Sequence, residues 1–270
     1  MSNEIKLIIS DIDGTLLTSQ HLLTKNLVQT LQEIQALSIP FIAASARSPR
    51  GILPIAQKLG IQNNPLAAYN GALITTDGNL PLFSHPLPAA GKKLLKLIKK
   101  FFPTISLNVY SNADWYTDSH NKWIEIEATI TKMQPIFLSF ADLLRQDPIH
   151  KLLLIGDAVE ITTLMNFLNT QELTDCAFYL SKENYLEITH KQVSKETVLH
   201  EMANFYAVPL QNVLTIGDNY NDLPMLKAAG LGIAMGNAPA PVKESADKVT
   251  ATNDQDGVAK ALKKYVLDSP

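Results

Sequence analysis

The fold is decided by one stretch near the start of this 270-residue chain, Lys6-Leu7-Ile8-Ile9-Ser10-Asp11-Ile12-Asp13-Gly14-Thr15-Leu16. Its apolar run predicts a strand that is buried on both faces, as in the middle of a parallel sheet. Two carboxylates follow, and because unpaired charge is costly to bury, we expect them at the open end of the strand, facing a ligand or a cation. Side chains two positions apart on a strand point the same way, so Asp11 and Asp13 can converge, and Gly14 lets the chain turn away.

A second stretch has the same spelling in a different context. Asp254-Gln255-Asp256-Gly257 follows the polar residues Thr252 and Asn253, with no apolar run before it. We therefore expect these aspartates to lead into a short C-terminal helix and to carry no chemistry. The preceding strand, and not the spelling of the motif, distinguishes the first copy.

Composition excludes several classes of function. The formal net charge is −3, so no basic surplus indicates a nucleic-acid partner. No apolar run approaches the ~18–20 residues that cross a bilayer, and the first residues lack the pattern of a signal peptide. Cys176 is the single cysteine, so no internal disulfide can form. These features favour a cytoplasmic protein that binds neither nucleic acid nor a membrane.

Strands and helices alternate in the first part of the chain. Thr24 predicts the N-cap of a helix, and residues 39–44 form a second apolar run that ends in Ser45. Ser48-Pro49 predicts the start of another helix, and residues 66–69 a third strand. This alternation is typical of βαβ units around a parallel sheet.

The pattern changes at a cluster of turn residues. Residues 73–83 predict a hairpin through Asp77-Gly78. The pattern from about residue 88 to residue 187 then predicts a separate α+β unit with antiparallel strands. After residue 190 the βα pattern resumes, so the α+β unit is inserted and not appended. We therefore predict a Rossmann-like α/β core, residues 1–84 and 190–270, with an inserted domain, residues 85–189.

Polar groups converge at the carboxyl ends of the predicted core strands or at the starts of helices. Ligands of open parallel sheets bind beyond these strand ends. Several carboxylates gathered there would repel one another, and Mg²⁺ with oxygen ligands relieves that repulsion. A lysine and a hydroxyl added to such a site suit a dianion, so the combination indicates phosphoryl transfer. The residues concerned are Asp11, Asp13, Ser45, Lys195, Asp218 and Asp222.

Each member of this set has a structural alternative. Ser45 could be an ordinary loop residue, Lys195 a surface lysine, and Asp222 the N-cap of the helix that begins near Pro224. Asp218 is harder to explain in this way, because it follows a buried strand and a glycine, much as Asp11 follows its own strand.

Taken together, the motifs resemble the haloacid dehalogenase (HAD)-type phosphatases, in particular the Cof-like branch of subfamily IIB. The resemblance covers essentially the whole chain and implies a C2-type cap domain inserted after the third strand. It rests on Asp11-Ile12-Asp13-Gly14-Thr15-Leu16, Ile42-Ala43-Ala44-Ser45-Ala46-Arg47, Asn70-Gly71-Ala72, Val193-Ser194-Lys195, Gly217-Asp218-Asn219-Tyr220-Asn221-Asp222 and Ala234-Met235-Gly236-Asn237-Ala238.

The resemblance also implies a role for each site residue. Asp11 would be the nucleophile that forms an aspartyl-phosphate, and Asp13 the general acid and base. Ser45 and Lys195 would bind the phosphoryl oxygens, with help from Asn221. Mg²⁺ would be held by the carboxylate of Asp11, the backbone carbonyl of Asp13, and Asp218, with Asp222 in or near the coordination shell.

Two positions depart from the family pattern. Ala46 replaces the usual glycine of the second motif, which matters if that residue needs a positive φ. Glu196 follows Lys195 where glycine is usual, and its charge would either weaken phosphate binding or point to solvent. Lys191 is a rival for the phosphate-binding lysine, although Lys195 matches the register of the motif better.

The expected activity is hydrolysis of small phosphorylated metabolites, such as sugar phosphates, by a monomer or homodimer. A phosphomutase or phosphotransferase on the same scaffold, or a non-catalytic phosphometabolite sensor, are the alternatives. The inserted domain would close over the site and contact the leaving group through residues within 105–135, where Trp115, Tyr116 and Trp123 are candidates. For each of these aromatic side chains, packing inside the inserted domain is the competing interpretation.

Overall fold

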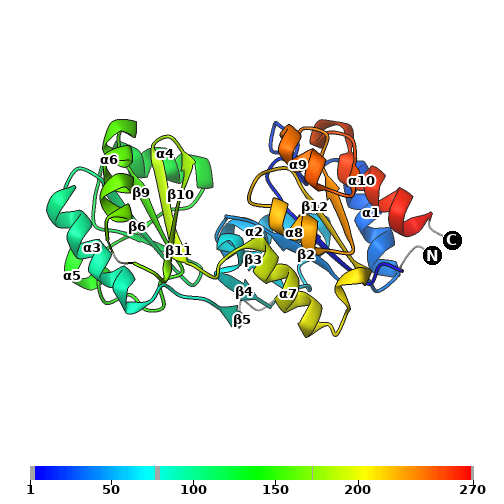
Figure 1. The fold of residues 1–270 in the computed structure, drawn as a ribbon, viewed down its shortest axis with the longest axis horizontal. Coiled ribbons are helices and arrows are strands. Elements are labelled where there is room, and N and C mark those ends of the chain that lie inside the picture. Colours follow the sequence, from blue (N-terminus) through cyan, green and yellow to red (C-terminus); the bar gives the residue numbers. More distant parts are fainter. Residues whose placement is uncertain (1–3, 77–79, 172, 269–270) are drawn as a thin grey trace. The chain divides into compact units, whose positions relative to one another are not determined.

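The computed structural model describes residues 4–76, 80–171 and 173–268, which form two compact units (Figure 1). The core unit comprises the described residues within 1–47, 52–83 and 194–270, and the insert unit those within 48–51 and 84–193. In the described part of the chain, no helix is both long and apolar enough to span a membrane. The predicted Asp77-Gly78 turn lies outside the described residues.

The core unit is built on a sheet of eight strands among the described residues, in the order β14-β13-β12-β1-β2-β3-β4-β5. From β14 to β3 neighbouring strands are parallel, whereas β4 returns antiparallel to β3. The strands are β1 Leu7–Ser10, β2 Phe41–Ala44, β3 Leu66–Ala68, β4 Leu73–Thr75, β5 Pro81–Ser84, β12 Val213–Gly217, β13 Leu231–Ala234 and β14 Lys248–Val249.

The apolar runs form the strands because both faces of the sheet are covered. Leu7 and Ile9 of β1 face a cluster that includes residues of α7 and α8, while Ile8 between them is also fully buried. Helices α1 and α10 pack against each other (Figure 1). The helices of this unit are α1 Lys25–Ala36, α2 Pro49–Leu59 from residue 52 onward, α7 Lys195–Phe205, α8 Leu223–Ala228, α9 Ala240–Ser245 and α10 Gly257–Leu262.

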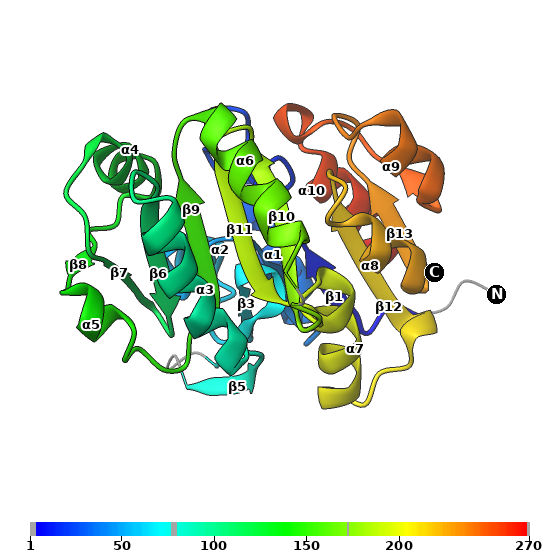
Figure 2. The same ribbon diagram turned by 60° about the vertical axis from the view of Figure 1, so that its left-hand side comes forward.

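The insert unit has its own sheet and its own apolar core. Within the described residues its strands follow the order β10-β11-β9-β6-β7-β8, with only the β7–β8 pair parallel. Helices α3 and α6 pack on one face (Figure 2). The elements are α3 Ala89–Phe101, β6 Ser106–Ser111, β7 Asp114–Thr117, α4 Lys122–Thr131, β8 Ile136–Phe137, α5 Phe140–Leu143, β9 Lys151–Ile155, α6 Ala158–Asn169, β10 Cys176–Lys182 and β11 Tyr185–His190.

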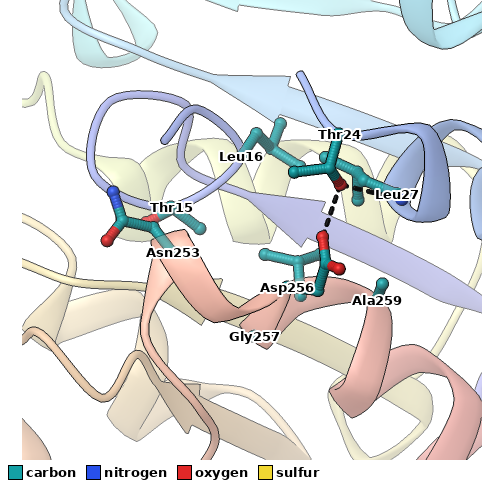
Figure 3. Close-up of a pocket in the computed structure, with 9 residues that line it drawn as sticks. Thr15, Leu16, Thr24, Leu27, Asn253, Asp256, Gly257 and Ala259 are labelled. Carbon is teal, nitrogen blue, oxygen red and sulfur yellow. Dashed lines mark hydrogen bonds between the residues drawn. The ribbon is translucent and has the colours of Figure 1, made fainter. Parts of the chain in front are cut away.

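The second Asp-x-Asp-Gly stretch has a structural role, as expected from its context. Asp256 directly precedes α10, and its carboxylate accepts a hydrogen bond from the hydroxyl of Thr24, the N-cap of α1 (Figure 3). Asp254 accepts a hydrogen bond from the backbone N–H of Ser19 at 2.8 Å. These aspartates therefore tie the C-terminal segment to the loop between β1 and α1.

Candidate active site

Strand register brings the predicted site residues to one edge of the core sheet. Ser10, the last residue of β1, pairs with Ile216 of β12 and with Ala43 of β2. The residues just beyond these strand ends, including Asp11, Ser45 and Asp218, therefore emerge side by side. The chain runs outward from β1 in one direction through β2 and β3, and in the other through β12 to β14. Ligands of open α/β sheets bind at such a switch point.

Lys195 is enclosed between two aspartates. Its ammonium group donates hydrogen bonds to Asp11 Oδ1 and, at 2.5 Å, to Asp222 Oδ1. The side chains of Lys195, Asp11 and Asp222 are 1%, 8% and 0% exposed. A buried ammonium needs such partners, because taking an unpaired charge out of water is very costly. Lys195 is therefore not a surface lysine but part of a buried charge cluster.

Burial and crowding of like charges shift the pKa values of this cluster. Desolvation, together with the charges of Asp222 and Asp218, raises the pKa of Asp11 to about 8, although Lys195 opposes the shift. Burial and the charge of Asp222 also raise the pKa of Asp218. Burial alone would lower the pKa of Lys195, but its two carboxylate partners raise it above the ordinary value. The cluster thus holds more negative charge than one lysine offsets.

Asp222 does not cap α8 in the predicted way. It stands at the N-cap position, but its side chain makes no capping hydrogen bond. Instead Asp222 Oδ2 accepts hydrogen bonds from the backbone N–H groups of Asp218 and Asn219, at 2.9 and 3.0 Å. The carboxylate therefore shapes the loop before the helix and, through its other oxygen, holds Lys195. The predicted N-cap position is therefore confirmed, but the side chain does not cap the helix, because the upstream loop and Lys195 take both of its oxygens.

Asp218 is oriented by residues to which the sequence analysis gave no role. Thr15 Oγ1 donates a hydrogen bond to Asp218 Oδ1 at 3.0 Å. Asn237 Nδ2 contacts Asp218 Oδ2 at 3.3 Å and also donates to the carbonyl of Gly14 at 2.9 Å. Thr15 and Asn237 both lie within motifs on which the family resemblance rests. Their place in those motifs was the one sequence signal that could have identified them.

The acidic cluster fits a divalent cation. Asp11, Asp218 and Asp222 each offer a carboxylate oxygen, and these three atoms lie within 4.8 Å of one another. Asp11 Oδ2 is buried and accepts no hydrogen bond, which is an unfavourable state for a carboxylate oxygen. A hard cation such as Mg²⁺, which prefers oxygen ligands, would satisfy this atom and offset the surplus negative charge.

Asp13 pairs with an arginine that the sequence analysis did not assign. Arg47 Nε donates to Asp13 Oδ2 at 2.7 Å, and Arg47 Nη2 donates to Asp13 Oδ1 at 2.6 Å. This two-bond contact is the strong and geometrically specific form of an ion pair. Both side chains are partly exposed, at 31% for Arg47 and 41% for Asp13. Arg47 therefore holds the Asp13 carboxylate in the orientation that this structure shows.

Comparison with known proteins identifies the family. A family model described as haloacid dehalogenase-like hydrolase matches residues 8–262. The chain is also 36% identical, over 260 residues, to a "Putative phosphatase" of Haemophilus influenzae, an alignment that covers 96% of this chain and 97% of the relative. The chain belongs to the haloacid dehalogenase-like hydrolase family.

Further haloacid dehalogenase-like matches extend over the whole fold. A Bacillus subtilis protein named 5-amino-6-(5-phospho-D-ribitylamino)uracil phosphatase YitU is 27% identical over 271 residues, covering 98% of this chain and 99% of the relative. A crystal structure of a haloacid dehalogenase-like hydrolase from Bacteroides thetaiotaomicron matches with a TM-score of 0.89 at 31% identity, covering 97% of this chain and 99% of that chain. The chain is thus a haloacid dehalogenase-family phosphatase, and its predicted fold class is confirmed.

The two departures from the family motifs do not disturb the site. Ala46 is not among the residues with positive φ, so its backbone does not need a glycine. Glu196 is 45% exposed and lies 3.9 Å from His200, one turn along α7. Ser194 caps α7 by accepting the N–H of Thr197 at 3.0 Å, which makes Lys195 the first helical residue.

Other candidates lie elsewhere in the structure. Lys191, the rival lysine, is half-exposed and forms an ion pair with Asp175 at 2.7 Å. In the insert unit Trp115 is buried, stacks on Tyr110 and donates to Asn108 Oδ1 at 2.9 Å. Tyr116 packs against the apolar core of the same unit. For these two aromatic residues, packing inside the insert unit is the role that their contacts describe. The ring of Trp123 lies 4.3 Å from the ammonium group of Lys122.

Proposed function

We propose that the chain is a Mg²⁺-dependent phosphatase that hydrolyses small phosphorylated metabolites, such as sugar phosphates, through an aspartyl-phosphate intermediate. One observation carries the proposal: the Asp11 carboxylate is buried beyond the end of the central strand, with one oxygen on Lys195 and the other without a hydrogen-bond donor. Lys195 directs this carboxylate and burial removes it from water, and a bound cation would favour its ionised form, which covalent catalysis requires.

In the first half of the reaction, an Asp11 oxygen attacks phosphorus and the bond from phosphorus to the ester oxygen breaks. The leaving alcohol takes a proton from Asp13. Lys195, the Ser45 hydroxyl and the Asn221 carboxamide hold the phosphoryl oxygens while charge redistributes over them. The Asp13 oxygen that carries the proton has to be free of Arg47, so we expect Asp13 to turn toward the leaving oxygen in this step.

In the second half, Asp13 takes a proton from water as the water oxygen attacks phosphorus. The bond between phosphorus and Asp11 breaks, which releases inorganic phosphate and restores the Asp11 carboxylate. The proton that Asp13 lost in the first half is thereby recovered. The net reaction is an ester and water giving an alcohol and phosphate.

We expect the cation to be held by the carboxylates of Asp11 and Asp218 and by the backbone carbonyl of Asp13. Asp222 would support this site through its hydrogen bonds with Lys195 and with the backbone N–H of Asp218. A bound Mg²⁺ would offset negative charge on the phosphoryl group and on the aspartates. A cytoplasmic location goes with this proposal, since the chain carries one cysteine and can form no internal disulfide.

The test is phosphate release from a panel of esters with Mg²⁺, compared with release in EDTA and by Asp11→Asn. The panel includes sugar phosphates, flavin mononucleotide, pyridoxal phosphate and 5-amino-6-(5-phospho-D-ribitylamino)uracil, the compound in the name of a Bacillus subtilis relative. We expect release that requires Mg²⁺ and is lost in Asp11→Asn. Release that persists in Asp11→Asn would contradict the assignment of the nucleophile. Transfer to a second alcohol in preference to water would identify a mutase or phosphotransferase.

A further inference from the structure

Three consecutive residues beyond β3 adopt a backbone conformation that L-amino acids rarely use. Tyr69, Asn70 and Gly71 have φ values of +53°, +57° and +104°. For a bulky residue such as Tyr69 this conformation is a genuine outlier, whereas asparagine adopts it more readily than most residues. Tyr69 is fully buried and Asn70 nearly so. Such strain persists only where the surroundings fix it, and it concentrates at functional sites.

The surroundings of this turn are the segments that carry the active site. The backbone N–H of Asn70 donates to the carbonyl of Ser45 at 2.8 Å, and that of Tyr69 to the carbonyl of Arg47 at 2.9 Å. On the other side, a Cβ added at Gly71 would lie 2.6 Å from Val198 and 3.1 Å from the carbonyl of Ser194. The turn is thus bonded to the Ser45 loop and packed against the start of the helix that bears Lys195.

The side chain of Asn70 extends this arrangement to a third segment. Its Oδ1 accepts a hydrogen bond from Asn221 Nδ2 at 3.4 Å. A carboxamide nitrogen has two N–H donors. When one of them is committed to Asn70, the orientation of the Asn221 carboxamide is set, and the other donor remains for a phosphoryl oxygen. A rotation that exchanged oxygen for nitrogen would turn a lone pair toward the anion instead.

We infer that Asn70 is a positioning residue, which the strained turn holds so that its carboxamide fixes Asn221 for binding a phosphoryl group. This inference rests on the proposed function, which gives Asn221 its phosphate-binding role. Asn70 acts through Asn221, and the left-handed backbone is what brings its side chain to that partner.

Two substitutions of Asn70 distinguish the effect of its carboxamide from the effect of its backbone conformation. Asn70→Gly removes the carboxamide and tolerates the positive φ, whereas Asn70→Ala removes the carboxamide and keeps the strain. If the carboxamide matters, both variants bind phosphate equally weakly, although Asn70→Ala has the lower melting temperature. If Asn70 serves only the backbone, Asn70→Gly binds as the wild type does and Asn70→Ala does not.

The measurement is calorimetric titration of inorganic phosphate into the full chain with Mg²⁺, for wild type, Asn70→Gly, Asn70→Ala, Asn221→Ala and the Asn70→Gly/Asn221→Ala double variant. We expect the dissociation constant for phosphate to rise about tenfold in each single variant, which is the size of one charge-assisted hydrogen bond. The double variant should show no further loss of affinity. Wild-type affinity in Asn70→Gly, or additive losses in the double variant, would overturn the inference. So would a wild type that binds no phosphate.

This titration needs no turnover, so it is independent of the hydrolysis test. If no ester is hydrolysed but phosphate binding depends on Asn70, the proposed function is contradicted and the positioning role stands. Hydrolysis that requires Asp11, together with phosphate binding indifferent to Asn70, would contradict the positioning role alone.

Discussion

Lys195 shows how one buried cation holds an acidic site together. It is 1% exposed and bonds to Asp11 and Asp222, which lie far apart in the sequence. Without it, two carboxylates would be left buried with no ammonium partner. Removing one member of a buried ion pair is far more costly than removing an exposed partner, because the remaining charge stays out of water.

We predict that Lys195→Met lowers the free energy of unfolding by about 3–5 kcal/mol and phosphatase activity by roughly a hundred- to a thousandfold. Denaturant unfolding and ester hydrolysis measure the two effects. Lys191→Met is the matched control, since Lys191 is half-exposed in its ion pair with Asp175 and such pairs contribute at most about 1 kcal/mol. Equal destabilisation by the two substitutions would contradict the buried cluster.

His150 of the insert unit makes the stability of the chain dependent on pH. It is fully buried, Ser84 Oγ lies 3.1 Å from its Nε2, and its Nδ1 accepts the N–H of Asn112 at 3.0 Å. Burial, and to a smaller extent His85, lower the pKa of His150 from 6.5 to about 4. The unfolded chain therefore takes up the proton at a higher pH than the folded chain does. The stabilisation is complete above the unfolded pKa and is lost as pH falls toward the folded one.

We predict a loss of about 2 kcal/mol of unfolding free energy from this group between pH ~7.5 and pH ~5. Denaturant unfolding at the two pH values measures it in wild type and in His150→Asn, which should show a shallower dependence. His200→Gln is the control for replacing a histidine, because the His200 side chain is half-exposed on α7 and lies in the core unit, not in the insert unit with His150. Equal slopes in wild type and His150→Asn would refute the assignment.

At the scale of elements, the loop after β1 is shaped to fit Asp218. Gly14 has φ +84°, and a Cβ added there would lie 2.4 Å from Asp218 Oδ2. We predict that Gly14→Ala raises the Mg²⁺ concentration for half-maximal activity by about tenfold or more, because it displaces Asp218, a proposed ligand of the cation.

Gly60→Ala is the control for that substitution. Gly60 has φ +73°, and its added Cβ would approach the Gln35 side chain at 3.4 Å, away from the acidic cluster. It therefore imposes similar backbone strain without touching Asp218. Titration of activity with Mg²⁺ distinguishes the two variants. An unchanged Mg²⁺ requirement in Gly14→Ala would show that the close contact does not govern the site.

Local sequence patterns predicted most elements because those elements are buried in regular ways. The apolar runs became β1, β2 and β12, and Thr24 caps α1 as expected. Strand β8, residues Ile136–Phe137, was missed because it is short and exposed. The pairing of Arg47 with Asp13 was missed for a different reason: it joins residues 34 positions apart, and no local pattern records such a contact.

The turn at Tyr69–Gly71 could be predicted from the sequence only in part. Asn70-Gly71 is a recognisable turn signal, yet nothing local predicts a positive φ for Tyr69, which tertiary contacts impose. Asp222 was placed at the correct helix end, but its side chain bonds to the preceding loop and to Lys195. The polar groups of the site were therefore predictable as a set, whereas their individual partners were not.

At the scale of the whole molecule, the active site opposes the stability of the fold in the absence of a cation. Asp218 adds a third carboxylate to Asp11 and Asp222, and both burial and Asp222 raise its pKa. Sites of this kind are commonly kept for function at some cost in stability.

We predict that Asp218→Asn is more stable than wild type in EDTA, by about 1 kcal/mol, because it removes like-charge repulsion. Saturating Mg²⁺ should reverse the order. A cation present at a hundred times its dissociation constant stabilises the folded state by about 2.7 kcal/mol. Asp218→Asn lacks one of the proposed coordinating carboxylates and should gain less of this stabilisation. Thermal unfolding of both proteins, with and without Mg²⁺, measures the crossover. An equal rise in melting temperature in the two proteins would place the cation elsewhere.

The most direct measurement is to trap the phosphoryl group during turnover. The enzyme is mixed with a radiolabelled form of the ester that it hydrolyses fastest, quenched in acid within one turnover, digested and mapped. We predict label on the peptide that contains Asp11, released by hydroxylamine as an acyl phosphate should be, and absent from Asp11→Asn. Rapid turnover with no label on protein, or label on another residue, would contradict a reaction through Asp11.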